Sequence, residues 1–553
     1  MNPANANNGA GGKHGGILNV VTNEDARDLD PGAAYFTIDY EFTYATQRPL
    51  YSYLPNNPTT AVPDLASGPA QISADHKTVT VHIRPGVHFS PPVNREVTSA
   101  DVAYAIERGF NPHVPSPYAG AYYGDVIGTA TAKGGPIPGI QTPDKYTIVF
   151  KLSKPTGGLL AQAFVLPLSA PVPKEYAQKF DAHTPTDYGN YQVATGPYKF
   201  ASDANGKVIG IGYQPGKSIK LVRNPNWSAA TDYRPAYVDG VNWSIGVAPE
   251  VGGRQTLMGS HIVDGDTPAA SIVKLAYQRY RSQIFFSPGS DNRYVALNTQ
   301  APPFNDANLR KAVYAAMNRK QLGTVRGGLL VATPATHFIF PGTPGFAEAG
   351  GAAGPPYDFN RSVTGDMAVA AAYMKKAGFP SGKYTGGRAI SVVGSTGDPA
   401  NLDAQIVNQT LEGLGFKTNF KLVDHSVMYG KFCGTPKQEV NVCPNVAWGR
   451  DFADPQTILQ PTFEGSAIVP VNNSNWPQLN DPVINAAMDK AKLVSGTAER
   501  AAAWGKIDDM VTATAAAVPW SWDNQANVWS KDVECVNALY NTGPCDFNFS
   551  SLK

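Results

Sequence analysis

Charged residues are scarce in this chain of 553 residues. Asp, Glu, Lys and Arg together make up 16%, whereas a typical soluble protein has about a quarter. The charges nearly cancel, leaving a formal net charge of +1, and no run of Lys and Arg is longer than a dipeptide. The chain therefore lacks the basic runs typical of nucleic-acid binding, and no nucleic-acid partner is expected.

Long apolar runs are missing as well. No stretch of 18 apolar residues occurs, so the sequence predicts no membrane-spanning helix. No signal peptide is visible at the start. Residues 1–15 are rich in Asn, Gly and Ala, which predicts a flexible tether. This start is typical of an exported protein after removal of its signal, and a precursor with a lipid-bearing Cys ahead of residue 1 fits the same pattern.

Motifs of known catalytic sites are also absent. The chain has no Gly-x-Ser-x-Gly elbow, no Walker loop and no HExxH, and its nine His residues include no pair at metal-ligand spacing. We therefore predict no catalytic residue, no metal site and no cofactor. A secreted enzyme whose catalytic residues come from distant positions stays open as an alternative of another class.

Cysteine is rare, and its spacing is informative. The four residues Cys433, Cys443, Cys535 and Cys545 form two pairs, each ten residues apart, without a CxxC motif. Two local disulfides are the simplest interpretation, and they indicate an oxidising compartment. Each would contribute about 2–3 kcal/mol by constraining the unfolded chain. The alternative is four unpaired buried thiols.

Strand and helix patterns alternate along the chain. Its length suggests two or three domains. Alternating or β-branched apolar runs predict strands at 16–22, 78–84, 146–152, 294–298 and 518–522. Capping residues and apolar periodicity predict helices after Thr98, after Asp306, at 402–414 with Gly415 as its C-cap, and twice within 483–516. This alternation indicates an α/β fold.

One turn resembles the start of a calcium loop. Residues 203–206 read Asp-Ala-Asn-Gly, but the remaining acidic ligands are missing. We interpret it as a hairpin turn between strands at 198–200 and 208–211.

Several blocks, in the same order, resemble the family 5 extracellular solute-binding proteins, the dipeptide- and oligopeptide-binding group. The most specific is Val79–Arg108, VTVHIRPGVHFSPPVNREVTSADVAYAIER. The others are Leu29-Asp30-Pro31, Thr195-Gly196-Pro197-Tyr198, Leu221–Trp227, Tyr294–Arg319 and Trp448–Pro455. Together the blocks extend over roughly residues 16–530.

The resemblance implies a two-lobed, periplasmic-binding-protein-like fold of class II, cluster C type. Lobe I would contain 16–285 and 521–553, with an extra subdomain at about 60–190, and lobe II would contain 286–520. Hinge segments are expected near 280–292 and 516–526. A solute would bind between the lobes, and closure would follow from its contacts with the closed state. The implied function is capture of peptides for the permease of a bacterial ABC importer, by an extracytoplasmic monomer.

The resemblance also implies which residue binds the ligand's amine. In peptide-binding relatives an aspartate of the Trp-x-x-Asp block pairs with the α-amine, and the matching residue is Asp451. A buried ammonium needs such a partner. A surface or capping acid is the alternative. Asp454, just before Pro455, is interpreted as a turn or cap residue instead.

The same block contains two other candidate ligand contacts. Trp448 would wall a side-chain pocket, although core packing explains it too, and Arg450 is its charged neighbour. A Cys433–Cys443 bridge would stiffen the approach to Asp451.

Lobe I supplies two further candidates. Tyr35, Phe36 and Thr37 align with a strand whose backbone pairs with bound peptide in relatives. Thr195 and Gly196 either border the cleft or form a purely structural turn.

One departure concerns the ligand's far end. Dipeptide binders hold its carboxylate with an arginine in a lobe II loop, but the matching loop, 394–399, has none. Arg450, nearby in sequence, stays open as a substitute. A longer peptide therefore fits better than a strict dipeptide. The same fold also carries oligosaccharides and metal or haem complexes, so these ligands stay open, as does a surface receptor without transport.

Overall fold

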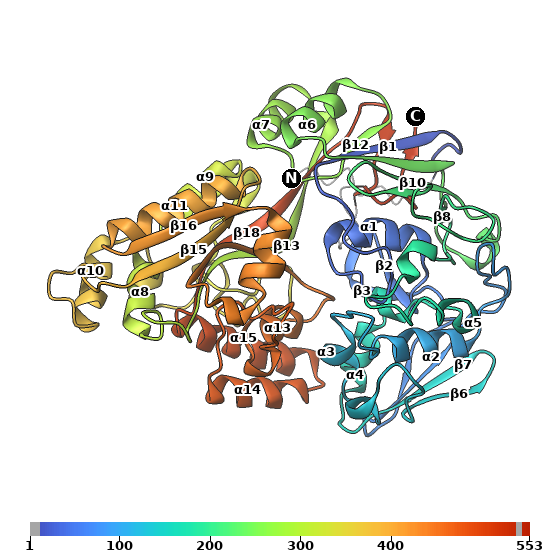
Figure 1. The fold of residues 1–553 in the computed structure, drawn as a ribbon, viewed down its shortest axis with the longest axis horizontal. Helices are drawn as coiled ribbons and strands as arrows, with labels where there is room; N and C mark the ends of the chain where they lie inside the picture. The colour runs from blue at the N-terminus through green and yellow to red at the C-terminus, as the bar shows by residue number, and fades with distance from the viewer. Residues whose placement is uncertain (1–10, 538–544) are drawn as a thin grey trace. The chain divides into compact units, whose positions relative to one another are not determined.

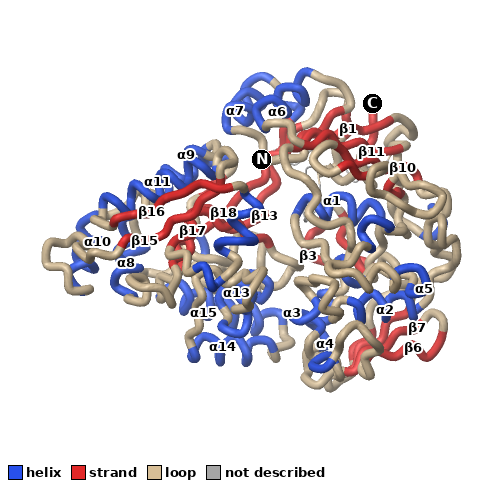
Figure 2. Tube along the Cα trace, viewed as in Figure 1, coloured by secondary structure: helices blue, strands red, loops and turns tan. Residues whose placement is uncertain are grey.

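The computed structural model describes residues 11–537 and 545–553, apart from the side chains of residues 288 and 290. The chain forms two compact units. Unit 1 contains the described residues up to Pro268, Leu275–Phe285 and Ala526–Lys553, and unit 2 contains Ala269–Lys274 and Phe286–Gln525. Each unit combines helices with sheet (Figures 1 and 2). This confirms the predicted α/β class.

The main sheet of unit 1 has parallel strands at its centre. The strand order is β12-β1-β11-β10-β8, with β9 paired to β10. Strand β1 runs parallel to β11 and β12, whereas β10 is antiparallel to β11. The strands are β1 (Ile17–Thr22), β8 (Tyr198–Phe200), β9 (Tyr213–Gln214), β10 (Ser218–Arg223), β11 (Gly240–Ile245) and β12 (Ile262–Asp264). The carboxyl ends of β1, β11 and β12 therefore meet at one edge.

A smaller antiparallel sheet lies within the predicted extra subdomain. Its order is β4-β5-β7-β6, with β4 (Gln71–Ile72), β5 (Thr78–His82), β6 (Ile140–Asp144) and β7 (Thr147–Lys151). Helix α2 (Ser99–Arg108) packs on β6 and β7. The sequence predicted Thr98 as its N-cap, and the structure shows a capping box in which Thr98 and Asp101 bond each other's backbone.

The remaining elements of this part are short. They are α1 (Thr37–Thr46), β2 (Tyr51–Leu54), β3 (Asn57–Pro63), α3 (Ala119–Tyr123), α4 (Gly157–Ala163), α5 (Lys174–Ala177), α6 (Pro249–Met258), β19 (Val533–Glu534) and β20 (Ser551–Leu552). Helix α7 (Ala270–Arg279) is divided between the two units after Lys274.

A buried ion cluster connects α2 to the first turn of the chain. The Arg108 guanidinium donates to both oxygens of Asp30, at 2.7 Å each, and through Nε to Asp181 at 3.0 Å. All three residues are at most 5% exposed. Two carboxylates share one guanidinium away from water. Removal of the guanidinium would therefore leave two negative charges buried without a partner.

Unit 2 is built on a mixed sheet with helices on both faces. The strand order is β14-β18-β13-β17-β15-β16, and β15 runs parallel to β16 and β17. The strands are β13 (Ile284–Leu297), β14 (Ala332–Thr333), β15 (Ala389–Ser395), β16 (Lys417–Val423), β17 (Val442–Gly449) and β18 (Ala517–Val528). The helices are α8 (Ala307–Ala316), α9 (Arg319–Val325), α10 (Met367–Lys376), α11 (Ala400–Gly413), α12 (His425–Val427), α13 (Gln456–Phe463), α14 (Pro482–Lys492) and α15 (Thr497–Ala513).

Side-chain alternation along β13 separates two hydrophobic cores. Val295 and Leu297 join the core of α8, α10 and α11, whereas Tyr294 and Ala296 join the core of α13, α14 and α15. Figure 1 shows these helix groups on opposite faces of the unit 2 sheet. The period of two places neighbouring residues of a strand on opposite faces.

Most local predictions are confirmed. The strands expected at 16–22, 78–84, 146–152, 294–298 and 518–522 are β1, β5, β7, β13 and β18, and the predicted helices are α2, α8, α11, α14 and α15. Asp306 caps α8, and Gly415 follows α11 with φ +95°. Both predicted disulfides, Cys433–Cys443 and Cys535–Cys545, are present.

Two local predictions need correction. The turn at 203–206 forms, with Asp203 accepting from the Asn205 and Lys207 N–H groups, but residues 208–211 are not the partner strand, because β8 pairs with β10 instead. The predicted tether is also too long. Residues 1–10 lie outside the described residues. Lys13 forms an isolated antiparallel β-bridge with Leu552, and the Gly15 N–H donates to the Tyr237 carbonyl, so these residues pack on unit 1.

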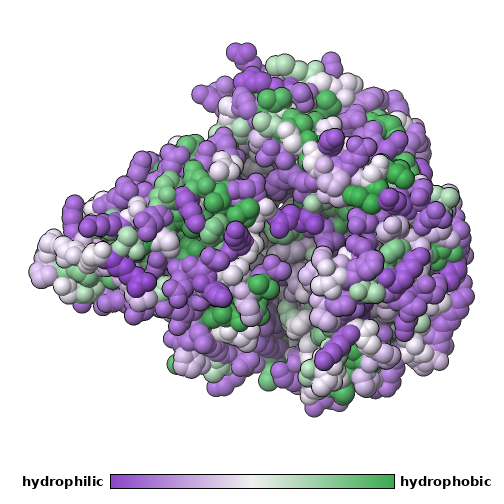
Figure 3. Space-filling view, viewed as in Figure 1, coloured by the Kyte–Doolittle hydropathy of each residue, from purple (hydrophilic) through white to green (hydrophobic). Residues whose placement is uncertain are grey.

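No helix among the described residues is both long and apolar enough to cross a bilayer. Figure 3 shows hydrophilic residues spread across each unit on the face in view.

We expect Arg108→Met to destabilise unit 1 by about 3–5 kcal/mol, because it leaves Asp30 and Asp181 buried without their cation. Urea unfolding measures this loss. Arg254→Met is the matched control, since Arg254 lies in an exposed ion pair with Glu250 and should matter little. Equal midpoints for the two variants would contradict the importance of the cluster.

Candidate functional site

The predicted ligand-binding block lies where β17 ends in unit 2. Trp448 is the second-to-last residue of β17, and Arg450 and Asp451 are the first two residues after the strand. In open α/β sheets, ligands bind beyond the carboxyl ends of the parallel strands. The sheet therefore places this block at the edge where a ligand is expected.

Each residue of the block is held in a different way. The indole N–H of Trp448 donates to the Thr457 carbonyl at 2.8 Å, and its half-buried ring packs on the α13–α15 core. The guanidinium of Arg450 donates to the Gly342 carbonyl at 3.1 Å and lies 6.0 Å from the Phe340 ring centroid. Arg450 and Asp451 are each only 7% exposed. Asp451 is therefore a buried acid, as an amine-binding role requires.

Asp454 has the structural role that the sequence predicted. Its carboxylate accepts from the Gln456 N–H at 2.9 Å and from Arg500 Nη2 at 2.9 Å. It thus caps the start of α13 and pairs with a cation of α15.

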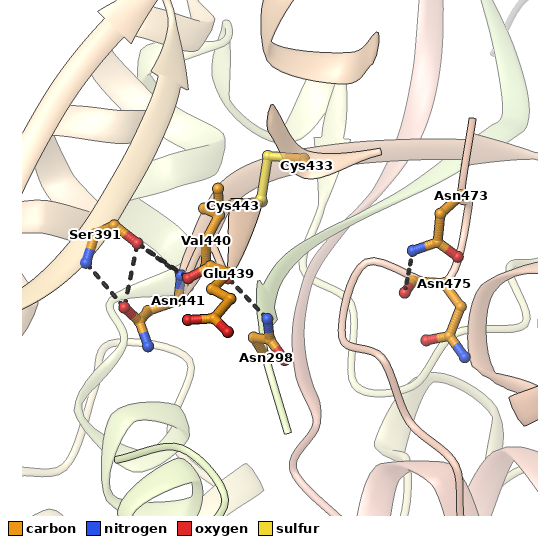
Figure 4. The surroundings of a disulfide bond; sticks show 9 residues. All are labelled: Asn298, Ser391, Cys433, Glu439, Val440, Asn441, Cys443, Asn473 and Asn475. Atoms are coloured by element: carbon orange, nitrogen blue, oxygen red, sulfur yellow. Dashed lines mark hydrogen bonds between the residues drawn. A yellow bond between two sulfur atoms is a disulfide. The ribbon is translucent and has the colours of Figure 1, made fainter. Parts of the chain in front are cut away.

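A disulfide and side-chain amides fix β17 from its two sides. Cys433–Cys443 attaches the π-helical turn Met428–Cys433 to the start of the strand. Figure 4 shows Asn441 bonded to Ser391 and Asn298 bonded to the Val440 carbonyl beside this bridge. Further along, the Ala447 N–H donates to the hydroxyl of Tyr429, a residue of the same turn. The strand that carries the block is therefore tied to the turn at two points.

A buried polar network beside this block was missed by the sequence reasoning. It joins Arg293 of β13, Asn445 of β17, Asp523 of β18, Arg326 after α9 and Asp403 in the first turn of α11. Arg293 pairs with Asp523, which also accepts from Arg326 at 3.3 Å. Asn445 accepts from Arg293 at 3.2 Å and donates to Asp403 at 2.9 Å. Both guanidinium groups therefore already have carboxylate partners.

Burial changes the proton affinity of this network. Desolvation raises the pKa of Asp403 to about 7, although Arg326 and Arg293 oppose the shift. Asp523 is also buried, yet the two arginines hold its pKa below the ordinary value. The two acids differ because Asp523 has close cationic partners, whereas the nearest Arg326 nitrogen lies 3.8 Å from Asp403.

In unit 1, residues 35–37 are not the strand that the alignment implied. Thr37 begins α1, and Phe36 is its N-cap. The backbone N–H groups of Tyr35 and Phe36 donate to Asp39 at 3.3 and 3.2 Å. These two groups bond the side chain of Asp39 in the helix that follows, so the segment is not a strand. A backbone contact between residues 35–37 and a peptide stays a prediction.

The carboxylate of Asp39 collects further donors. It also accepts from the N–H groups of Arg27 and Asp28. Burial still raises the pKa of Asp39 to about 6, because desolvation outweighs these bonds.

Thr195 and Gly196 pack against the end of α1. Both N–H groups donate to the Thr46 carbonyl, and Thr195 Oγ1 accepts from the Arg48 N–H at 3.0 Å. A Cβ on Gly196 would lie 2.9 Å from the Ala45 carbonyl oxygen. These contacts favour the structural alternative, a tight turn that needs glycine for close approach.

Among the described residues, no group of three or more His, Cys, Asp or Glu side chains is arranged to hold a metal ion.

The fold and these blocks identify the class of protein. Residues 60–469 match the family described as bacterial extracellular solute-binding proteins, family 5. Since the match covers most of the chain, the protein belongs to this family, and the resemblance seen in the sequence is confirmed.

The similarity to known proteins extends over most of the length of both chains. The chain is 25% identical to Di/tripeptide-binding protein 2 of Pseudomonas aeruginosa, covering 88% of this chain and 85% of the relative. It is 24% identical to the periplasmic oligopeptide-binding protein OppA of Escherichia coli, covering 80% and 76%. Among solved structures, it resembles clavulanic acid biosynthesis oligopeptide binding protein 2 with a TM-score of 0.82 and 26% identity, covering 98% and 96%. The predicted periplasmic-binding-protein-like fold is thus confirmed.

We expect Asp403→Asn to flatten the pH dependence of unit 2 stability. A folded-state pKa above the unfolded value means that stability falls as pH rises from about 4 to about 7. The wild type should therefore lose more thermal stability between pH 5 and pH 8 than the variant. Melting curves at both pH values measure the difference, and identical losses would contradict the shifted pKa.

The double variant Cys433→Ala/Cys443→Ala should lower the stability of unit 2 by about 2–3 kcal/mol, because it frees a short loop in the unfolded chain. Denaturant unfolding checks this value. Cys535→Ala/Cys545→Ala removes a bridge of equal separation in unit 1 and serves as the control. An unchanged unit 2 transition in the first variant would be contrary to expectation.

Proposed function

We propose that the protein is the extracytoplasmic solute-binding component of a bacterial ABC importer and that it captures peptides for a membrane permease. The observation that carries this proposal is Asp451, a buried acid just past the carboxyl end of β17. Its block stands in a chain of family 5, whose relatives include oligopeptide- and di/tripeptide-binding proteins. These relatives are binding proteins, and we assign this chain no catalytic role.

Asp451 supplies what a peptide's amino terminus needs. An ammonium leaving water requires a countercharge and hydrogen-bond acceptors, and one carboxylate offers both. Trp448 lies three residues earlier, and its ring is only partly buried against the core. The exposed part of the ring would contact a ligand side chain. Arg450 supports the block through its bond to Gly342.

The lack of an arginine to bind the ligand's carboxylate favours oligopeptides over strict dipeptides as ligands. The loop after β15, residues 396–399, contains no arginine. The nearby guanidinium groups of Arg293 and Arg326 already pair with Asp523. No described group of this network is thus left to clamp a carboxylate at a fixed distance from Asp451, and a longer ligand needs no such clamp.

The same proposal covers location and partners. Two disulfides suit an oxidising compartment outside the cytoplasm. The protein would act there as a monomer that hands its ligand to the permease subunits. A lipid anchor on the precursor would keep it near them.

The central test is affinity for free and N-acetylated oligoalanines, measured by isothermal titration calorimetry. Asp451→Asn should weaken binding of the free-amine peptide about 30-fold or more, because it removes one partner of a buried charge pair. Acetylation should weaken wild-type binding similarly and have little further effect on the variant.

Asp489→Asn is the matched control, since Asp489 is an exposed acid of unit 2 with a side chain 70% accessible. It should bind as the wild type does. Native mass spectrometry of the purified protein adds an independent readout. Release of a sugar or metal complex instead of peptides, or full affinity in Asp451→Asn, would refute the proposal.

A further inference from the structure

Three carboxylates gather at the strand-end edge of the unit 1 sheet. Asp264 ends β12, Asp266 follows two residues later, and Glu41 comes from α1. Asp266 accepts from the Thr22 hydroxyl at 2.7 Å, just where β1 ends, and its own N–H donates to Asp264 at 3.2 Å. The group therefore occupies the edge where the parallel strands β1 and β12 finish, the position at which open α/β sheets bind ligands.

Two of these acids have a buried oxygen without a hydrogen-bond partner. Glu41 is 4% exposed and Asp264 is 1% exposed. Glu41 Oε2 and Asp264 Oδ2 make no hydrogen bond to any described group, although the Trp243 indole lies close enough to Glu41 to lower its pKa in part. Buried polar atoms in folded proteins nearly always have a partner. These two oxygens are thus acceptors that a bound donor would satisfy.

The group also lacks a countercharge. Within the described part of the chain, no Lys or Arg nitrogen lies within 4 Å of the carboxylates of Glu41, Asp264 or Asp266. Desolvation raises the pKa of Glu41 and of Asp264, and repulsion from Asp266 raises both further. The nearby carboxylate of Glu24 also raises the pKa of Glu41. Burial raises the pKa of Asp266 itself to about 6. Elsewhere in unit 1, by contrast, Asp30 and Asp64 are buried against arginines.

We propose that Glu41, Asp264 and Asp266 form a receptor for an organic cation on the solute, an alkylammonium or a guanidinium. Such a group brings a positive charge, which all three acids lack, together with N–H donors for the unpartnered oxygens of Glu41 and Asp264. The described carboxylates are not arranged to hold a metal ion, so the inference commits to an organic cation. Asp266 is half-buried and forms the entrance.

Identifying the ligand that carries this cation as a peptide rests on the proposed function. The side chain of a lysine or arginine residue in a peptide supplies such a cation. The protein would then prefer basic peptides over neutral ones of equal length. A free diamine offers the same chemistry without a peptide, and the experiment separates the two sources.

Cation binding has a signature that ordinary packing would not produce. A bound positive charge favours the ionised form of neighbouring acids. The three carboxyl groups would therefore release protons when the cation arrives. Near pH 7, this release appears in calorimetry as a binding enthalpy that depends on the ionisation enthalpy of the buffer.

The test uses tetra-alanine peptides in which each position in turn carries lysine or its uncharged match, norleucine. Titrations are run at pH 7 in two buffers, with 1,4-diaminobutane and calcium chloride as separate probes. At one position, the lysine peptide should bind at least about tenfold more tightly than its match, as expected for a charge-assisted hydrogen bond. It should also release protons that its match does not.

Variants of Glu41 and Asp266 test whether the effect comes from this group of acids. Glu41→Gln and Asp266→Asn should remove the lysine preference and the proton release while leaving norleucine peptides unaffected. Glu250→Gln, an exposed acid of α6, should change neither. Asp266→Asn lies at the half-buried entrance and keeps the test valid if Glu41→Gln fails to fold.

The outcomes distinguish this inference from the proposed function. Proton release by 1,4-diaminobutane alone, lost in both variants, would support the receptor even if no peptide binds. Equal affinity for lysine and norleucine peptides at every position, without proton release, would overturn it while peptide binding stands. Calcium producing the same proton release would also overturn it, because the site would then be a metal site.

Discussion

The cost of removing a charge from water governs both units of this protein. Several buried carboxylates with structural roles have an arginine partner, as in the pairs Arg108–Asp30, Arg48–Asp64 and Arg500–Asp454, and Asp39 has four backbone N–H donors instead. Breaking such a pair leaves one charge uncompensated in a medium that cannot solvate it. The core elements therefore depend on these pairs as much as on apolar packing. Departures from this pattern are the natural places to look for binding.

The departures lie at the strand-end edges. In unit 2, Asp403 has a cationic neighbour no closer than 3.8 Å, and its pKa rises to about 7. In unit 1, Glu41 and Asp264 have no cation within 4 Å among the described residues. A protein that keeps costly carboxylates at such positions carries local electrostatic strain, and strain of this kind is relieved when a partner of opposite charge binds.

Local signals in the sequence were enough to place most elements. Thr98 predicted the start of α2 because threonine is a favoured N-cap, and Gly415 predicted the end of α11 because a left-handed residue is needed there. Pairing between distant segments was not accessible in this way. The turn at 203–206 was right, but the partner of β8 is β10, and no local pattern distinguishes it from the next segment.

In the candidate site, too, contacts between distant residues could not be predicted from local sequence patterns. Asp451 could be found because its block is continuous in sequence. The ion network could not, since Arg293 and Asp523 are 230 residues apart. The one available hint for the acid group was Asp264-Gly265-Asp266 directly after an apolar strand. Residues 35–37 were misread because the capping role of Asp39 looks, in sequence, like one more polar residue in an extended segment.

The contact between residues 11–15 and the end of the chain has a practical consequence. Lys13 bridges to Leu552, and the chain finishes at Lys553 in unit 1. A fluorophore or tag on either end of the described chain would therefore report on unit 1 alone. Any probe of unit 2 must be introduced at an internal surface position such as Asp489, whose side chain is well exposed.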